Sequence, residues 1–126
     1  MSEAPFRDPA IRVMLLPKDT NGHGTIFGGV ILSHIDLAGA VEARRHTRHQ
    51  VVTVAMDKVD FHGPAFVGDV VSFYTSLVRK GTTSVRVKVT VEARRDVDPR
   101  VTGLITEAEV IYVAVDDQGK KAALDS

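Results

Sequence analysis

A single carboxylate, Asp36, stands inside the most apolar stretch of the chain. On a helix, Leu32 and Ala40 would share its face, because residues four apart lie one above the other. Placing a carboxylate in such surroundings is costly, so it must be bonded to a neighbouring polar group or put to use. The use that fits is that of a general base acting on water. The residue alone leaves both interpretations open.

Asn21 lies fifteen residues before Asp36, in a loop dense in turn-forming residues, and taken alone it indicates a turn. Gly28 and Gly29 follow where the apolar stretch begins. The first backbone N–H groups of a helix have no partner within it, and without side chains to shield them they can approach a carbonyl oxygen. The pair is therefore either an oxyanion hole or a place of close packing.

The elements that must position these groups follow from the apolar pattern. A short apolar run at 11–16 ends at Pro17, as a strand would, and residues 28–45 predict a helix that is apolar on nearly every side. Strict alternation within 84–95 predicts a strand with one buried face. Segments rich in β-branched residues predict four strands after the helix, at 51–61, 69–79, 83–94 and 101–115.

The order strand, helix, four strands predicts an α+β domain of the hotdog fold. In this fold one long central helix is wrapped by a curved antiparallel sheet, here of five to six strands. We expect the domain at residues 11–117, after an N-terminal arm at 1–10 and before a polar C-terminal tail at 118–126. Residues 96–100, around Pro99, predict a polar connection between the last two strands.

Composition excludes several classes of protein. The 126 residues carry 16 Lys+Arg against 16 Asp+Glu, which removes the simplest electrostatic reason to bind nucleic acid or an anionic membrane. The absence of cysteine excludes a disulfide, a thiolate metal site and a Cys nucleophile. The N-terminus lacks the pattern of a signal peptide, and the longest apolar stretch is too short to span a bilayer. We therefore expect a cytoplasmic protein.

The run from Leu16 to Gly29, continuing through Leu32-Ser33-His34-Ile35-Asp36, resembles the signature of YciA-type hotdog acyl-CoA thioesterases. Matching segments follow at 51–54, 64–71, 80–84 and 112–116, so the resemblance covers roughly residues 10–120. It implies hydrolysis of an acyl-CoA thioester to free coenzyme A and a carboxylic acid, without a cofactor or a metal. It also implies a dimer, and hexamers built as trimers of dimers are common in the family.

The resemblance further implies that Asp36 of one subunit directs water at the thioester and faces Asn21 of the other. The amides of Gly28 and Gly29 would hold the carbonyl oxygen. Coenzyme A would contact the turn after the third strand, two arginines at the end of the fourth, and a channel for its pantetheine arm. These three groups are Lys80, Gly81, Thr82 and Ser84; Arg94 and Arg95; and Thr53 and Val54. Solvated strand-end charge is an equally good interpretation of the two arginines.

Two departures from the family pattern concern the acyl-chain preference and the finer CoA contacts. The position before the proline of Phe61-His62-Gly63-Pro64 is often basic in the family, and Thr25 stands where an acidic residue is usual. Two other functions stay open: a hotdog hydratase or dehydratase with His23 as its catalytic histidine, and a noncatalytic acyl-CoA sensor. We interpret His46 and His49 as surface residues rather than metal ligands.

Overall fold

The computed structural model describes residues 8–95, 97–98 and 100–126. The predicted arm therefore lies outside the described residues up to residue 7, as do Asp96 and Pro99 of the predicted polar connection. Within the described residues, no helix is long and apolar enough to cross a membrane. In chain order the elements are β1 (Ile11–Met14), the 3-10 helix η1 (Pro17–Asp19), α1 (Gly28–Ala43), the 3-10 helix η2 (Arg44–His46), β2 (Gln50–Phe61), β3 (Val70–Lys80), β4 (Ser84–Arg94) and β5 (Thr102–Val115).

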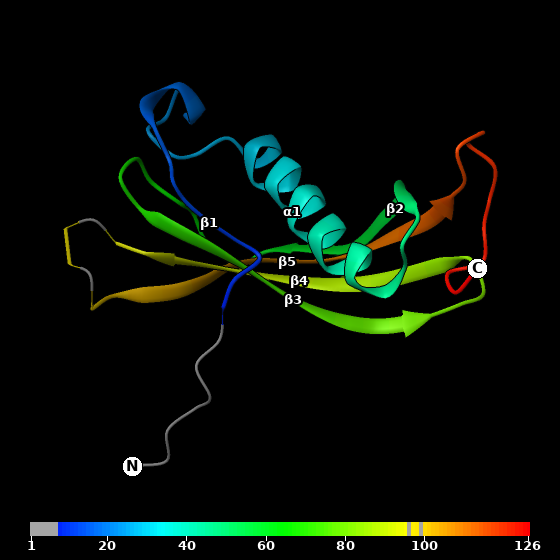
Figure 1. Cartoon of the computed structure of the whole chain (residues 1–126). Coiled ribbons are helices and arrows are strands. Elements are labelled where there is room, and N and C mark those ends of the chain that lie inside the picture. Colours follow the sequence, from blue (N-terminus) through cyan, green and yellow to red (C-terminus); the bar gives the residue numbers. More distant parts are fainter. Residues whose placement is uncertain (1–7, 96, 99) are drawn as a thin grey trace, which may run out of the picture.

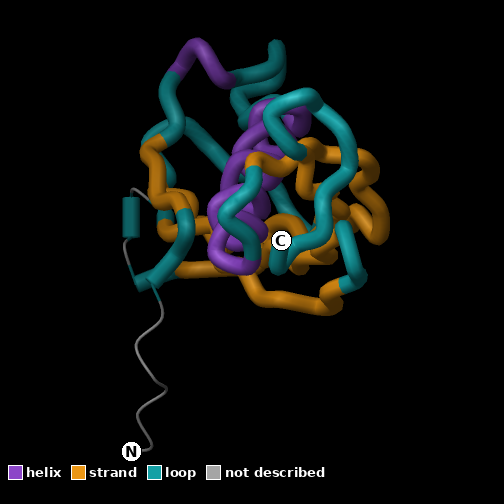
Figure 2. The backbone as a smooth tube through the Cα atoms, turned by 45° about the vertical axis from the view of Figure 1, so that its right-hand side comes forward, coloured by secondary structure: helices purple, strands orange, loops and turns teal. Residues whose placement is uncertain are grey.

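The five strands form one sheet in the order β1-β3-β4-β5-β2, and every neighbouring pair is antiparallel. β3, β4 and β5 follow one another as hairpins, while β1 and β2 are added at the two edges. α1 connects these edges and lies across the concave side of the curved sheet (Figures 1 and 2). The predicted hotdog fold, with one long helix and five antiparallel strands, is confirmed.

The core lies between α1 and the concave side of the sheet. The alternation predicted for β4 is confirmed, because its odd-numbered apolar residues are buried and its even-numbered polar residues are not. Side chains on one face of α1 pack against these buried residues of β4. The buried residues of these two elements are Val85, Val87, Val89, Val91 and Ala93 in the sheet and Ile31, Ile35, Ala38 and Ala43 in the helix.

The helix is shorter and less enclosed than the sequence predicts. α1 ends at Ala43 and the chain tightens into η2, rather than running on as one helix to Arg45. One sheet can cover only one side of a helix, so the far side stays open. Phe27, Leu37 and Val41 there are 59%, 59% and 49% exposed. The expected wrapping of the helix by the curved sheet is present on one side of α1, and this chain leaves the other side open.

The strand β2 is an edge of the sheet and is irregular. Its pairing with β5 shifts once between Thr53 and Ala55, which leaves Val54 as an extra residue, and again between Asp57 and Asp60. Lys58, within the second irregularity, has a φ of 52°, in the left-handed region. Bulges of this kind bend a strand and re-aim its side chains. β2 therefore presents different surfaces in its two halves.

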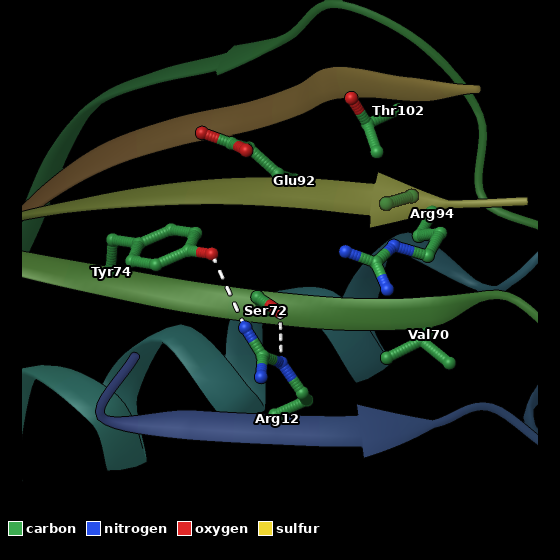
Figure 3. A pocket seen from close by; sticks show the side chains of 8 residues that line it. Arg12, Val70, Ser72, Tyr74, Glu92, Arg94 and Thr102 are labelled. Carbon is green, nitrogen blue, oxygen red and sulfur yellow. Dashed lines mark hydrogen bonds between the residues drawn. The ribbon is translucent and has the colours of Figure 1, made fainter. Parts of the chain in front are cut away.

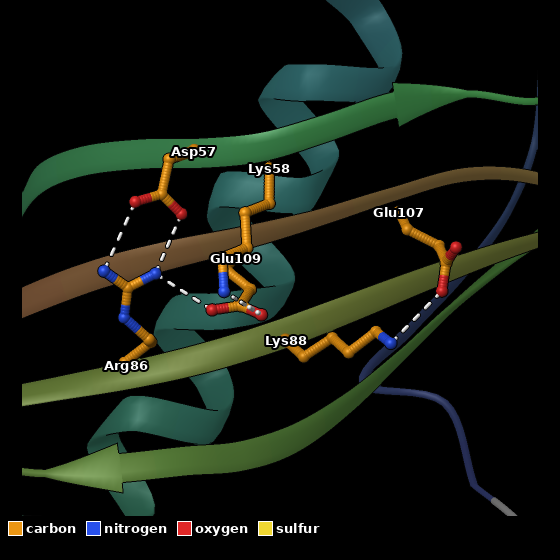
Figure 4. Close-up of polar contacts among 6 residues, drawn as sticks. All are labelled: Asp57, Lys58, Arg86, Lys88, Glu107 and Glu109. Carbon is orange, nitrogen blue, oxygen red and sulfur yellow. Dashed lines mark hydrogen bonds and ion pairs between the residues drawn. The ribbon is translucent and has the colours of Figure 1, made fainter.

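The convex side of the sheet, away from α1, carries an ion-pair network (Figure 4). Arg86 donates to Asp57 at 2.8 Å and to Glu109 at 2.9 Å, and Lys88 lies 3.2 Å from Glu107. We call this set, together with Lys58, which lies 3.7 Å from Glu109, the outer ion-pair network. Opposite charges on adjacent strands stabilise the sheet and are exposed to water.

The C-terminal residues do not form a loose polar tail. The backbone N–H of Leu124 donates to the carbonyl of Thr82 at 2.9 Å, and Thr47 donates its hydroxyl to the carbonyl of Leu124 at 2.9 Å. Leu124 is 3% exposed, so its side chain belongs to the core. The polar composition of 118–126 concealed the apolar anchor Leu124 and the backbone bond of Ala122 to Ala114.

Candidate active site

Asp36 lies midway along α1, partly buried, on the side of the helix next to β2 and β5. The hydroxyl of Thr53 donates to Oδ1 of Asp36 at 2.7 Å, and the hydroxyl of Tyr112 donates to the main-chain oxygen of Asp36 at 2.6 Å. Thr53 and Tyr112 are directly opposite each other in the β2–β5 pairing. A cross-strand pair of hydroxyls thus holds both the backbone and the carboxylate of this residue.

The two interpretations of Asp36 left open by the sequence meet in this arrangement. The carboxylate is bonded, but its donor, Thr53, is a neutral hydroxyl. Among the described residues no Lys, Arg or His forms an ion pair with Asp36. A neutral donor fixes the orientation of a carboxylate without neutralising its charge. The Asp36 carboxylate is therefore held in a fixed orientation by a neutral donor.

The Asn21 loop is closed by its own side chains. The side-chain amide of Asn21 donates to the hydroxyl of Thr25 at 2.8 Å, and its oxygen accepts the backbone N–H of His23 at 2.7 Å. Thr25 stands where the family usually has an acidic residue, and here it serves as the partner of Asn21. The turn expected from the sequence is present, and it places Asn21 partly buried just before α1.

The two glycines open α1 between two exposed aromatic rings. A methyl group added at Gly29 would lie 2.8 Å from a ring carbon of Phe27, and one at Gly28 would lie 3.5 Å from the ring of Phe61. Phe27 precedes the helix without capping it through its side chain. The N–H of Val30 donates to the carbonyl of Phe27 at 3.0 Å, whereas those of Gly28 and Gly29 have no backbone partner among the described residues and are available to an acceptor from outside. This arrangement suits a carbonyl oxygen.

One chain does not bring all of these groups together. Asp36 follows Gly28 by eight residues, which places it about 12 Å further along the helix axis at 1.5 Å per residue. The loop of Asn21 lies beyond the N-terminal end of α1 (Figure 1). No hydrogen bond joins Asn21 to Asp36 in the described part of the chain. Within one chain, the predicted catalytic residues therefore form two groups. Asn21, Gly28 and Gly29 lie at the N-terminal end of α1, and Asp36 lies midway along it.

The residues predicted to bind coenzyme A also separate into groups. Lys80 is exposed at the turn between β3 and β4, where the N–H of Gly81 donates to the carbonyl of Ser84 at 2.8 Å. Arg94 ends β4 at its other end, ten residues after Ser84, or about 33 Å along an extended strand. Thr53 and Val54 lie on β2 beside Asp36, where Val54 is 55% exposed.

The neighbouring arginines have different surroundings. Arg95 donates to the carboxylate of Asp69 and to the carbonyl of Pro64 at 3.3 Å, and its guanidinium lies 4.7 Å from the ring centroid of Phe66. Asp69 is 2% exposed and also accepts the N–H of Phe66 at 2.9 Å. Arg95 therefore binds the loop before β3 to the end of β4 and is not a solvated strand-end charge.

Arg94 lies in a hollow on the convex side of the sheet (Figure 3). Across this hollow, Arg12 donates to the hydroxyl of Ser72 at 2.8 Å and to that of Tyr74 at 3.4 Å. Asp36 lies on the opposite side of the sheet, so the hollow is separate from the candidate chemistry. Its lining residues are Arg12, Val70, Ser72, Tyr74, Glu92, Ala93, Arg94 and Thr102.

The histidines do not form a metal site. His46 bonds the carboxylate of Glu42 at 2.8 Å, whereas His49 bonds the hydroxyl of Ser126 at 2.9 Å. No group of three metal-ligating side chains occurs within the described residues. Burial acts to raise the pKa of Glu42, but hydrogen bonds from His46 and Thr75 outweigh it and the pKa is lowered. Glu42 is a structural carboxylate at the end of α1.

Sequence reasoning missed the two hydroxyls around Asp36. Thr53 was predicted only as a channel residue, and Tyr112 only as part of a matching segment. They lie 17 and 76 residues from Asp36 along the chain, so no local pattern links them to it. The signal that could have found them is the pairing of β2 with β5, which places both residues at one position across the sheet.

Comparison with known proteins gives consistent relatives. The family model described as thioesterase superfamily matches residues 23–99. The acyl-CoA thioester hydrolase YciA of Escherichia coli is 40% identical over 122 residues, which cover 95% of this chain and 92% of that protein. The crystal structure of a hexameric hotdog fold thioesterase of Campylobacter jejuni matches with a TM-score of 0.87 and 46% identity, covering 92% of this chain and 89% of that one.

An acyl-CoA hydrolase of Staphylococcus aureus bears on the site. Its structure with butyryl coenzyme A and coenzyme A matches with a TM-score of 0.83 and 32% identity, covering 92% of this chain and 70% of that one. It has also been solved as an Asn→Ala variant with coenzyme A and as an Asp→Ala variant. The two substituted positions are fifteen residues apart in that protein, as Asn21 and Asp36 are in this chain.

Proposed function

This chain belongs to the thioesterase superfamily, among its YciA-type acyl-CoA thioester hydrolases of the hotdog fold, and we propose that it hydrolyses an acyl-CoA by water attack directed by Asp36. The observation that carries the proposal is the setting of this carboxylate: midway along α1, oriented by Thr53 and without a cation partner among the described residues. A binding protein has no use for such a group beside a thioester.

In the proposed reaction, Asp36 takes a proton from water as the water oxygen attacks the thioester carbonyl carbon. The N–H groups of Gly28 and Gly29 hold the oxygen that becomes negative, and Asn21 orients the water or the substrate. When the C–S bond breaks, coenzyme A leaves as a thiolate and takes up the proton that Asp36 holds. The products are a carboxylic acid and free coenzyme A, and Asp36 returns to its starting state.

The geometry favours a site shared between two subunits. A base and an oxyanion hole serving one thioester must each lie within about 3 Å of the reacting atoms. Within one chain, the glycines and Asp36 are about 12 Å apart along α1, too far to meet on one carbonyl. We therefore propose that the glycines and Asn21 of one subunit act with Asp36 of another.

The open surface beside Asp36 supports this association. Leu37 and Val41 on α1 and Val52 and Val54 on β2 are apolar and between 46% and 59% exposed. A second copy covering them would remove apolar surface from water, which favours association. The hexameric thioesterase of Campylobacter jejuni shares the fold, and we propose that this chain likewise forms dimers and, from them, hexamers.

The residues proposed to bind the phosphates of coenzyme A are too far apart in one chain to act together. The turn of Lys80 and the end of β4 at Arg94 are about 33 Å apart along the strand, so the two groups of one chain cannot both hold the phosphates of one molecule. We propose that the phosphates bind at the Lys80 turn or near Arg94, and that Thr53 and Val54 line the pantetheine channel. Arg95, already bonded to Asp69, has the weakest claim to a phosphate.

The test is release of coenzyme A thiol from acyl-CoAs of short to long chain length. Wild type, Asp36→Ala and the control Asp57→Ala, which alters a carboxylate on the convex side, are compared at equal oligomeric state. We expect Asp36→Ala to lower kcat by about 10²- to 10⁴-fold, the usual contribution of a positioned base, and Asp57→Ala to leave it unchanged. Coenzyme A binding without turnover on any chain length would instead support a sensor.

A mixing experiment tests the shared site. Asp36→Ala and Asn21→Ala are each inactive in this proposal, but a hybrid dimer of the two retains one site with both groups intact. Dissociated and reassociated in equal amounts, the pair should regain about a quarter of the wild-type rate, because half of the random dimers are hybrids with one working site. No recovery, with hybrids demonstrated by mass spectrometry, would contradict the sharing.

A further inference from the structure

The hydroxyl of Tyr112 is a buried polar group that the proposed reaction does not use. The side chain is 1% exposed and stands between β5 and α1, where the hydroxyl donates to the main-chain oxygen of Asp36 at 2.6 Å. This bond holds the helix backbone at Asp36, and the Asp36 carboxylate is itself near enough to act on the pKa of the hydroxyl. Tyr112 is therefore placed to control where the helix carries Asp36, without itself touching a substrate.

Gly39 provides the space for this contact. It lies three residues after Asp36 on α1, and a methyl group added there would overlap the Tyr112 hydroxyl and lie 3.0 Å from the adjoining ring carbon. A glycine in the middle of a helix destabilises it by about 1 kcal/mol relative to alanine. The helix accepts this cost at the position where only glycine lets the tyrosine reach the backbone.

The opposite strand supplies the second contact. Thr53, paired with Tyr112 across β2 and β5, donates to the carboxylate of Asp36 at 2.7 Å. The pairing becomes irregular directly after Thr53, where Val54 is extra and Ala55 resumes opposite Ile111. Bulges are frequent beside active sites because they re-aim a side chain. The hydroxyls of Thr53 and Tyr112 thus both contact Asp36 from facing positions on β2 and β5.

We propose that Tyr112 is a positioning residue for the hydrolysis: its hydroxyl, admitted by Gly39, fixes the backbone of Asp36 above the sheet while Thr53 fixes the carboxylate. The inference rests on the proposed role of Asp36 as the base. Such control matters because catalytic groups must be held within about 0.5 Å of their productive position. A misplacement of about 1 Å can cost about 10² in rate.

The hydroxyl remains a donor throughout the working range of pH. Burial, and to a smaller extent the nearby Asp36 carboxylate, raise the pKa of Tyr112 well above its ordinary value of 10.0. The phenol therefore stays protonated where a thioesterase would be assayed. Ionisation of Tyr112, and the loss of its hydrogen bond to Asp36, therefore does not explain a change of rate with pH in that range.

The test compares Tyr112→Phe with Tyr74→Phe, which removes the chain's other phenol hydroxyl from the convex side. Both are measured as assembled protein with acyl-CoA, after melting temperature and oligomeric state have been matched to wild type. We expect Tyr112→Phe to lower kcat about five- to tenfold, the value of one lost hydrogen bond, with KM within about twofold. Tyr74→Phe should leave kcat unchanged; its KM is not used as a control, because Tyr74 lines the hollow that holds Arg94.

Two further variants separate positioning from general stability. If Tyr112 acts through Asp36, adding Tyr112→Phe to Asp36→Ala should not lower the residual rate further, because residues that act as a unit are not additive. Gly39→Ala should lower kcat alone, and less so when combined with Tyr112→Phe, which removes the overlapping hydroxyl. Gly39→Ala also displaces the ring without altering it, so it gives a second measure if Tyr112→Phe fails to assemble.

The outcomes are distinct. Unchanged kcat in Tyr112→Phe, a rise in KM alone, or a further loss in the Asp36→Ala background would each overturn the positioning role while leaving the proposed function intact. A wild type without turnover would remove the proposed function and this inference with it. A lower kcat in Tyr112→Phe, absent from the Asp36→Ala background, would support it.

Discussion

The carboxylates on the convex side of the sheet and Asp36 on its concave side have opposite surroundings. On the convex side, Asp57 and Glu109 share Arg86, and Glu107 pairs with Lys88. On the concave side, the Asp36 carboxylate accepts a hydrogen bond from Thr53, and its main-chain oxygen accepts one from Tyr112. Asp36 forms no ion pair among the described residues. The convex carboxylates are paired with cations, whereas Asp36, the proposed base, has hydroxyl donors instead.

The ion pairs on the convex side lower the pKa values of two of its carboxylates. A hydrogen bond from Arg86 lowers the pKa of Asp57, and hydrogen bonds from Lys88 and His62 lower that of Glu107. A carboxylate with a lowered pKa holds a proton less well and is a poorer general base. The convex carboxylates are therefore unsuited to the role proposed for Asp36, although Asp57 lies on the same strand as Thr53.

The largest change in folding stability is expected from replacing Arg95. Its replacement by alanine leaves Asp69, 2% exposed, as a buried charge without its cation. Removing one partner of a buried pair destabilises a protein by about 3–5 kcal/mol, which denaturant unfolding would measure. Arg94→Ala, the matched control at the next position, removes a charge exposed on the convex side and should leave stability nearly unchanged.

The same two variants decide between structural and ligand roles. If Arg94 contacts a phosphate of coenzyme A, Arg94→Ala should raise KM without changing kcat, whereas Arg95→Ala should mainly lower stability. A raised KM in Arg95→Ala with unaltered unfolding would reverse this assignment. The neighbouring arginines would then have exchanged the roles that their contacts indicate.

A smaller effect is expected at Thr53, the donor to the Asp36 carboxylate. Hydrogen bonds to charged groups contribute about 1.5–3 kcal/mol, so Thr53→Ala should lower kcat by about 10- to 100-fold. Thr53→Ser keeps the hydroxyl and should recover most of the rate. Equal losses in both variants would mean that the methyl group, and not the hydrogen bond, is what matters. Steady-state kinetics on one acyl-CoA suffices.

The smallest effect concerns the stability of the convex side at low pH. Because the folded-state pKa of Glu107 lies below its ordinary value of 4.5, its contribution to stability is complete above that value and is lost as pH falls through the folded pKa. Melting temperatures of wild type and Glu107→Gln should differ slightly near neutral pH and converge near pH 3. About 1 M salt should also reduce the difference, since it screens exposed charges.

The fold could be predicted because its signals are local. The alternation in β4, the turn of Lys80 and Gly81, and the long apolar helix each indicate an element without reference to the rest of the chain. Asp36 and the paired glycines could be singled out for the same reason, since each is unusual for its place in the sequence. Their catalytic roles stay predictions.

What could not be predicted depends on contacts between distant residues. The bonds of Thr53 and Tyr112 to Asp36 require the register of β2 against β5, and the bond of Arg95 to Asp69 requires the loop before β3 to fold back on β4. Apolar composition also does not say whether the same chain or another one covers a surface, so the open side of α1 could not be assigned to either. These properties belong to the assembled sheet.

The irregular edge strand has a consequence for behaviour at high concentration. A long, flat strand at the edge of a sheet can recruit further strands without limit and so lead to fibres. In β2 the apolar half around Val52 offers such an edge, but the other half carries Asp57 and Asp60 and bends at Lys58, where φ is 52°. Pairing is confined to one short stretch, which suits a closed assembly and opposes open-ended aggregation.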